Sequence, residues 1–123
     1  MADAGPIPAI LVSGGSASAR ESCIAAAIYA LPPGRTAVLM EGIPDGKLHL
    51  VEGPDLTIAR TAPGCLCCTG NLVMKITLNR LLRTRPSRIF IGVASRDHMA
   101  SLREILSSPP YSALLSMEPD LSA

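Results

Sequence analysis

The sequence predicts an α/β fold of three layers, in which helices flank both faces of a mainly parallel sheet. Three apolar runs carry the prediction, at residues 9–12, 36–40 and 88–93. Continuous runs of this kind are typical of strands that are buried on both faces of a parallel sheet. Segments with helical spacing of apolar residues lie between the runs, and strands that alternate with helices favour parallel pairing. We expect about four or five strands in total.

The first strand leads through a turn of small residues into the first helix. Ser18 and Glu21 stand three residues apart, as in a capping box. We therefore expect a helix at about 19–31, ended by the Pro-Pro-Gly sequence of residues 32–34. The residues expected on its packing side are Cys23, Ala26, Ala27 and Ala30.

The middle of the chain holds the second apolar strand, which ends at Glu41, and two further short strand candidates. These candidates, 48–51 and 56–61, flank Gly53 and Pro54 and suit a hairpin. A second helix is expected at about 71–84. Its apolar stripe consists of Met74, Leu78, Leu81 and Leu82.

The third apolar strand is followed by a loop at 95–97 and a helix at about 99–107, which ends at two prolines. We expect one domain over residues 1–123, since this length supports a single core. Loose tails are expected at 1–8 and 111–123, the latter with one short helical turn.

Composition argues against two classes of partner. The chain has a net charge of +1, no Trp, one Phe and two Tyr, so it lacks the basic field and the aromatic platforms of nucleic-acid-binding modules. No apolar run is long enough to span a bilayer. The start of the sequence lacks the basic residues of a signal peptide. We expect a cytoplasmic protein that binds neither nucleic acid nor membrane.

Three of the four cysteines, Cys65, Cys67 and Cys68, fall within four positions. Thiolates are preferred ligands of zinc and similar soft ions, and in a reducing compartment clustered cysteines indicate metal or redox chemistry before disulfides. A short segment rarely surrounds a tetrahedral ion alone, so Glu41, a histidine or a second copy are candidates for further ligands. His49 and His98 are each expected to be surface or turn residues. Cys23, among alanines, is expected to pack in the core.

The expected topology brings the candidate residues to one edge of the sheet. In open α/β sheets, ligands bind at the carboxyl ends of the strands. The Gly14–Gly15 turn, Glu41 and the cysteine segment each follow a predicted strand, and residues 95–98 should join them there. The turn precedes a helix, whose N-terminus favours anions.

This order of features resembles the CobW-type metallochaperone GTPases, relatives of the HypB and UreG classes. Residues 64–68, Gly-Cys-Leu-Cys-Cys, match the GCxCC signature of that family. Residues 72–91 resemble the segment after the signature, and residues 9–28 resemble the first strand, P-loop and first helix. The resemblance implies a P-loop NTPase-like fold, metal binding at the cysteines and a client metalloprotein as partner. The P-loop residues it implies are Gly14, Gly15, Ser18, Arg20 and Ser22.

The chain departs from the family at positions that carry the nucleotide chemistry. A P-loop reads GxxxxGK[ST], with a Lys on the phosphates and a hydroxyl on Mg²⁺. Here Ala19 stands for the second Gly, Arg20 for the Lys and Glu21 for the hydroxyl. The acidic motif after the third core strand becomes a stretch that begins at Gly92. The sequence stops before the guanine-specifying motif. We expect a shortened, degenerate P-loop domain in which GTP and Mg²⁺ binding is doubtful.

Three functions remain open. The first is a non-hydrolytic module that binds zinc or a similar metal at Cys65, Cys67, Cys68 and Glu41. The second is a divergent GTPase in metal trafficking, with Arg20 and Ser22 in place of the usual groups. The third is a structural or interaction module that forms a homodimer.

Overall fold

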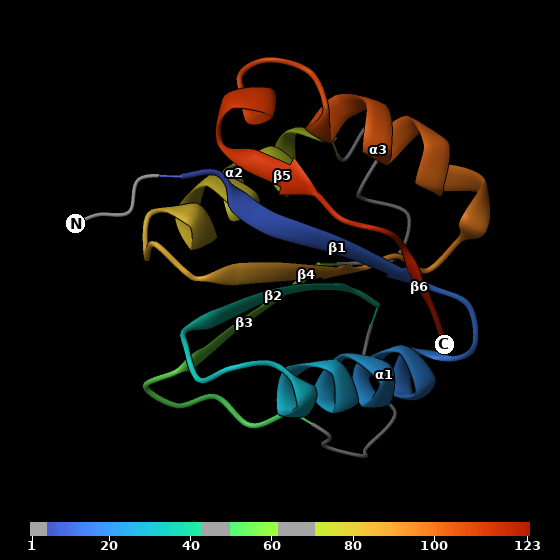
Figure 1. Ribbon diagram of the computed structural model, residues 1–123. Coiled ribbons are helices and arrows are strands. Elements are labelled where there is room, and N and C mark those ends of the chain that lie inside the picture. Colours follow the sequence, from blue (N-terminus) through green and yellow to red (C-terminus); the bar gives the residue numbers. More distant parts are fainter. Residues whose placement is uncertain (1–4, 43–49, 62–70) are drawn as a thin grey trace.

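The computed structural model describes residues 5–42, 50–61 and 71–123, and it confirms the three-layer α/β fold (Figure 1). One sheet has the strand order β3-β2-β4-β1-β5, and β6 also pairs with β1. All the strand pairings of the described residues are parallel, which is consistent with a P-loop-like fold. The strands are β1 (Ile7–Ser13), β2 (Thr36–Glu41), β3 (Leu56–Thr61), β4 (Arg88–Gly92), β5 (Leu115–Met117) and β6 (Leu121–Ser122).

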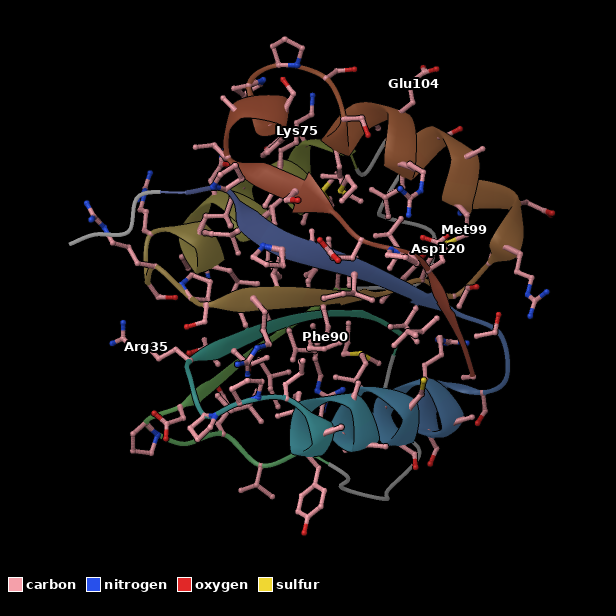
Figure 2. The ribbon with its side chains drawn as sticks, viewed as in Figure 1. Arg35, Lys75, Phe90, Met99, Glu104 and Asp120 are labelled. Atoms are coloured by element: carbon pink, nitrogen blue, oxygen red, sulfur yellow. The ribbon has the colours of Figure 1, made fainter. Side chains whose placement is uncertain are left out.

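The helices lie on both faces of the sheet, with α1 on one face and α2 and α3 on the other (Figure 1). Side chains alternate across a strand, so β1, β2 and β4 each contribute to two separate cores. Leu11 and Leu39 belong to the core under α2 and α3, whereas Val38 and Phe90 belong to the core under α1. Figure 2 shows Phe90 between the sheet and α1. The helical elements are α1 (Ala17–Ala30), α2 (Asn71–Leu82), α3 (Met99–Leu106) and the short 3-10 turns η1 (Arg96–His98) and η2 (Tyr111–Ala113).

Helix α1 begins two residues earlier than its sequence predicts. The cap is Ser16, whose hydroxyl accepts a hydrogen bond from the Ala19 amide at 3.0 Å, so the prediction that Ser18 and Glu21 form a capping box is wrong. The predicted packing side is confirmed only in part, since Cys23 and Ala27 pack against the core on the α1 side of the sheet. Ala26 and Ala30 are exposed, and the helix instead buries Arg20, Glu21 and Ile24. Charged residues occupy the buried face because they find hydrogen-bond partners there, which composition alone does not reveal.

The short strand 56–61 does not form the predicted hairpin. It runs parallel to β2, in the register Thr36 opposite Leu56 and Glu41 opposite Thr61. Of its predicted partner, residues 48 and 49 lie outside the described part of the chain, and Leu50 and Val51 are not in a strand. A turn closed by two backbone hydrogen bonds between Gly53 and Leu56 redirects the chain before β3.

The carboxy-terminal residues expected to be loose instead extend the sheet. β5 and β6 both lie along β1, and Pro119 stands between them. A proline lacks the amide proton that a continuous strand would donate, which explains the interruption. Tyr111 and Leu115 are buried in the core beside α3. At the other end, β1 already starts at Ile7, within the tail predicted at 1–8.

Candidate functional site

The carboxyl ends of the central strands meet at one edge of the sheet, here called the rim. Val12 of β1 and Met40 of β2 both lie opposite Gly92 of β4, so the three strands end side by side. The Gly14–Gly15 turn follows β1, and Glu41 ends β2. The predicted gathering of these residues at one edge is therefore observed for the described part of the site.

The Gly14–Gly15 turn connects β1 to α1 through two left-handed residues, with φ of +87° and +62°. Such angles favour glycine. The guanidinium of Arg20, the fourth residue of α1, reaches back to this turn. Its Nη1 donates to the carbonyl oxygens of Gly14 at 3.2 Å and Gly15 at 2.8 Å. The predicted replacement for the P-loop lysine is thus engaged with the turn itself.

Ala123, which directly follows β6, also lies against the Gly14–Gly15 turn. The amide of Ala123 donates to the Ser13 carbonyl oxygen at 2.7 Å, so the end of β6 lies beside the start of α1 (Figure 1). A Cβ on Gly14 would lie 3.2 Å from the carbonyl oxygen of Ala123 and 3.0 Å from Nη2 of Arg96. The tight approach requires a glycine, and it brings a second guanidinium to the turn.

Glu21, the residue at the aligned hydroxyl position, points away from the turn. Its side chain is buried, and its carboxylate accepts hydrogen bonds from Arg60 Nη1 at 3.1 Å and from the Leu50 amide at 3.3 Å. The carboxylate therefore joins α1 to β3. Ser22 is exposed on the outer side of α1, and Ser18 is half-buried at the start of the helix.

Glu41 is fully buried at the rim. Its Oε1 accepts a hydrogen bond of 2.8 Å from the Ala94 amide, which ties the end of β2 to the segment after β4. Gly92, where the family motif places an acid, packs against Met40, and a Cβ there would lie 2.7 Å from the Met40 sulfur. Gly92 therefore leaves space for the Met40 side chain in the core.

Cys65, Cys67 and Cys68 lie outside the described residues, as does His49. Within ranges 5–42, 50–61 and 71–123, no three His, Cys, Asp or Glu side chains are grouped as a metal site would require. Cys23 is half-buried and packs against the α1-side core, and His98 lies in η1.

Arg60 was not predicted from the sequence, whereas Arg96 lies in the segment 95–98 that the sequence places at this edge. Arg60 pairs with Glu21, and Arg96 approaches Gly14. A signal existed for Arg60, because strand alternation places it on the same face as Ile58, where a charged residue needs a buried partner. The position of Arg96 close to Gly14 agrees with the prediction that residues 95–98 join this edge.

Comparisons with known proteins give one partial relative. Over 59 residues the chain is 32% identical to the zinc chaperone YeiR of Escherichia coli (strain K12). The match covers 47% of this chain and 18% of that protein, so the chain spans less than a fifth of its length. No family model matches, and no solved structure matches. Among the described residues, none of the helices has the length and apolar character needed to cross a membrane. The partial match supports the resemblance to metallochaperones loosely.

Proposed function

We propose that the chain is a metal-binding module that takes up zinc, or a similar soft divalent ion, through Cys65, Cys67 and Cys68. One observation carries the proposal: Thr61 lies opposite Glu41 in the register of β2 and β3. Thr61 therefore lies beside a buried carboxylate and precedes Cys65 by four positions in the sequence. The chain from Thr61 to Cys65 can extend by at most ~14 Å, so the first thiol stays within reach of the rim.

The donor set fits zinc. Three thiolates leave one position of a tetrahedral site, and Glu41 is the proposed fourth ligand. Carboxylates that bind metals are usually held by further hydrogen bonds, and the Ala94 amide is such a partner for Glu41. The similarity to a zinc chaperone supports a role in metal handling, with the ion as cargo and a metalloprotein as its recipient.

Zinc titration under reducing conditions tests the proposal, with a chromophoric chelator as competitor and proton release as a second readout. Stoichiometric uptake with release of protons is expected. Replacing Cys65, Cys67 and Cys68 together by Ser should abolish it, whereas Cys23→Ser is the matched control and should bind as the parent does. Glu41→Gln keeps an acceptor for Ala94 and should weaken affinity by about tenfold or more. Absence of uptake, or equal uptake by the triple variant, would refute the proposal.

We further propose that the module does not hydrolyse nucleotides. The supporting observations are that Arg20 is bound to the turn, that Glu21 is paired with Arg60 and that Ser22 is exposed. A P-loop uses a lysine to bind the phosphates and a hydroxyl to bind Mg²⁺, and the three side chains, as placed, supply neither contact. Phosphate release from GTP with Mg²⁺ should stay at the rate of the buffer.

A divergent GTPase is the second candidate, and the preserved Gly14–Gly15 turn ahead of a 14-residue helix favours it. Under this alternative, GTP would raise the melting temperature and phosphate release would exceed the buffer rate. Loss of both effects in Arg20→Ala would assign them to the turn. The same protein preparation therefore separates the two candidates.

A further inference from the structure

Helix α2 has an outer face on which several apolar side chains are exposed to solvent. Its inner face packs into the core through Met74, Leu78 and Leu81. Its first half nevertheless exposes three aliphatic side chains: Leu72 is 67%, Val73 is 51% and Ile76 is 53% exposed. Exposed single hydrophobic residues are common, but three at helical spacing on one face form a patch that water solvates poorly.

The same face is basic at its carboxy-terminal end, where Arg80 lies in the last turn of α2 and Arg83 directly follows the helix. Arg80 and Arg83 are exposed, and residues 71–87 contain no Asp or Glu. Within the described ranges, the ion pairs to carboxylates involve Arg60 and Arg103 and include neither Arg80 nor Arg83. Lys75 is not part of this face, because it lines a hollow of about 200 Å³ against α3 together with Glu104 (Figure 2).

We propose that this face, formed by Leu72, Val73, Ile76, Arg80 and Arg83, is a docking surface for an acidic, amphipathic segment of a partner protein. Apolar side chains of the partner would cover the aliphatic half, and its carboxylates would pair with the two arginines. Charge selects the occupant, because two uncompensated guanidinium groups next to an apolar patch favour a partner that brings both kinds of group.

The composition of this face disfavours a second copy of the chain and a membrane as its occupant. A second copy docked through the same face would leave the two arginines without a carboxylate, since the face offers no acid. A membrane-binding helix typically carries aromatic side chains and has basic residues along its whole polar face, whereas this patch is aliphatic and its arginines lie at one end.

The position of the face fits such a role. The first turn of α2 follows directly on residues 62–70, so the aliphatic half begins next to the cysteine segment in the chain. The inference goes beyond metal binding and involves different residues, so either proposal can fail without the other.

Selection of random peptides displayed on phage tests the docking surface, with the full chain as bait. The enriched peptides should combine Asp or Glu with apolar residues at helical spacing. A synthetic peptide of the enriched sequence should bind at least about tenfold more weakly to the double variant Leu72→Gln/Ile76→Gln and to Arg80→Glu/Arg83→Glu. Tyr29→Gln is the matched control, because Tyr29 is 93% exposed on α1, and it should bind as the parent does.

Several results would overturn the proposal. Enriched peptides without acidic bias, or peptides that bind both double variants as tightly as the parent, would remove the surface. Light scattering that shows a dimer dissolved by Leu72→Gln/Ile76→Gln would assign the face to a second copy. Co-sedimentation with phosphatidylglycerol vesicles that both double variants abolish would assign it to a membrane. Circular dichroism and thermal melting of each variant verify that the substitutions leave the fold intact.

Discussion

At the scale of single residues, two adjacent charged side chains on α1 have opposite tasks. Successive residues of a helix point in directions about 100° apart. Arg20 therefore reaches the Gly14–Gly15 turn, while Glu21 reaches β3 and the Leu50 amide. Both are buried, and each has hydrogen-bond partners that offset the cost of removing a charge from water.

The pair of Glu21 and Arg60 should couple the stability of α1 to that of β3. Glu21 is 2% exposed and Arg60 28%, so solvent screens the pair only in part. A double-mutant cycle with Glu21→Gln and Arg60→Gln should give a coupling energy of about 1 kcal/mol in urea unfolding. A coupling near zero would mean that Glu21 stabilises the fold without a contribution from Arg60.

Tyr111 should make stability depend on alkaline pH. Burial raises the pKa of its phenol above the usual value of 10.0, because desolvation disfavours the phenolate. The unfolded chain then loses this proton first, so the stabilisation is complete below pH 10 and is lost as the pH rises through the folded pKa. Urea unfolding at increasing pH should show this decline in the parent and a shallower one in Tyr111→Phe. Tyr29→Phe, at an exposed position, should follow the parent.

At the scale of elements, the two edges of the sheet are protected from further strand pairing in different ways. On the β3 edge, the Glu52 carboxylate accepts from the Ile58 amide at 3.1 Å, and the Gly53 carbonyl accepts from the Leu56 amide. These contacts occupy outward amides that could otherwise pair with another strand. On the β1 side, the chain covers the edge itself with β5 and β6.

The contribution of β5 can be measured with two neighbouring leucines. Leu115 is 5% exposed and packs in the core, whereas Leu114 is 45% exposed. Leu115→Ala should lower the free energy of unfolding by about 2–3 kcal/mol through lost burial and a cavity. Leu114→Ala should change it by less than about 0.5 kcal/mol. Equal, small effects in thermal and urea unfolding would indicate that the carboxy-terminal segment is dispensable.

At the scale of the whole molecule, the sheet separates two apolar cores of different character. The core under α2 and α3 draws on strands, both helices and Tyr111, while the core under α1 is smaller and centred on Phe90 and Ile24. Strands β1, β2 and β4 contribute to both cores, so they unite the molecule.

Hydrogen exchange should follow this arrangement. The amides of β4 and β1 have strand neighbours on both sides and should exchange most slowly, close to the rate set by global unfolding. The amides of β3 and β6 lie at edges and should exchange faster through local opening. Mass spectrometry of peptides after timed exchange checks the order, and protection of β6 equal to that of β4 would contradict it.

Much of the fold could be predicted because burial imposes a pattern on the sequence. The fully buried strand β2 is a continuous apolar run, and the stripe of Met74, Leu78 and Leu81 marks the inner face of α2. The Gly14–Gly15 turn and Glu41 were placed at the rim for the same reason, since one follows the end of β1 and the other is the last residue of β2. The metal role of the cysteines stays a prediction, because these residues lie outside the described part of the chain.

The sequence by itself determined the alternation of strands and helices, and with it the parallel sheet and the edge where the candidate residues gather. Only the tertiary structure decided the partners of Arg20 and Glu21, the parallel course of β3 and the use of residues 115–117 and 121–122 as strands. The physical reason is the distance along the sequence over which each kind of interaction acts. Periodicity and turns depend on near neighbours in the chain, whereas a buried charge or a short edge strand is stabilised by groups distant in sequence.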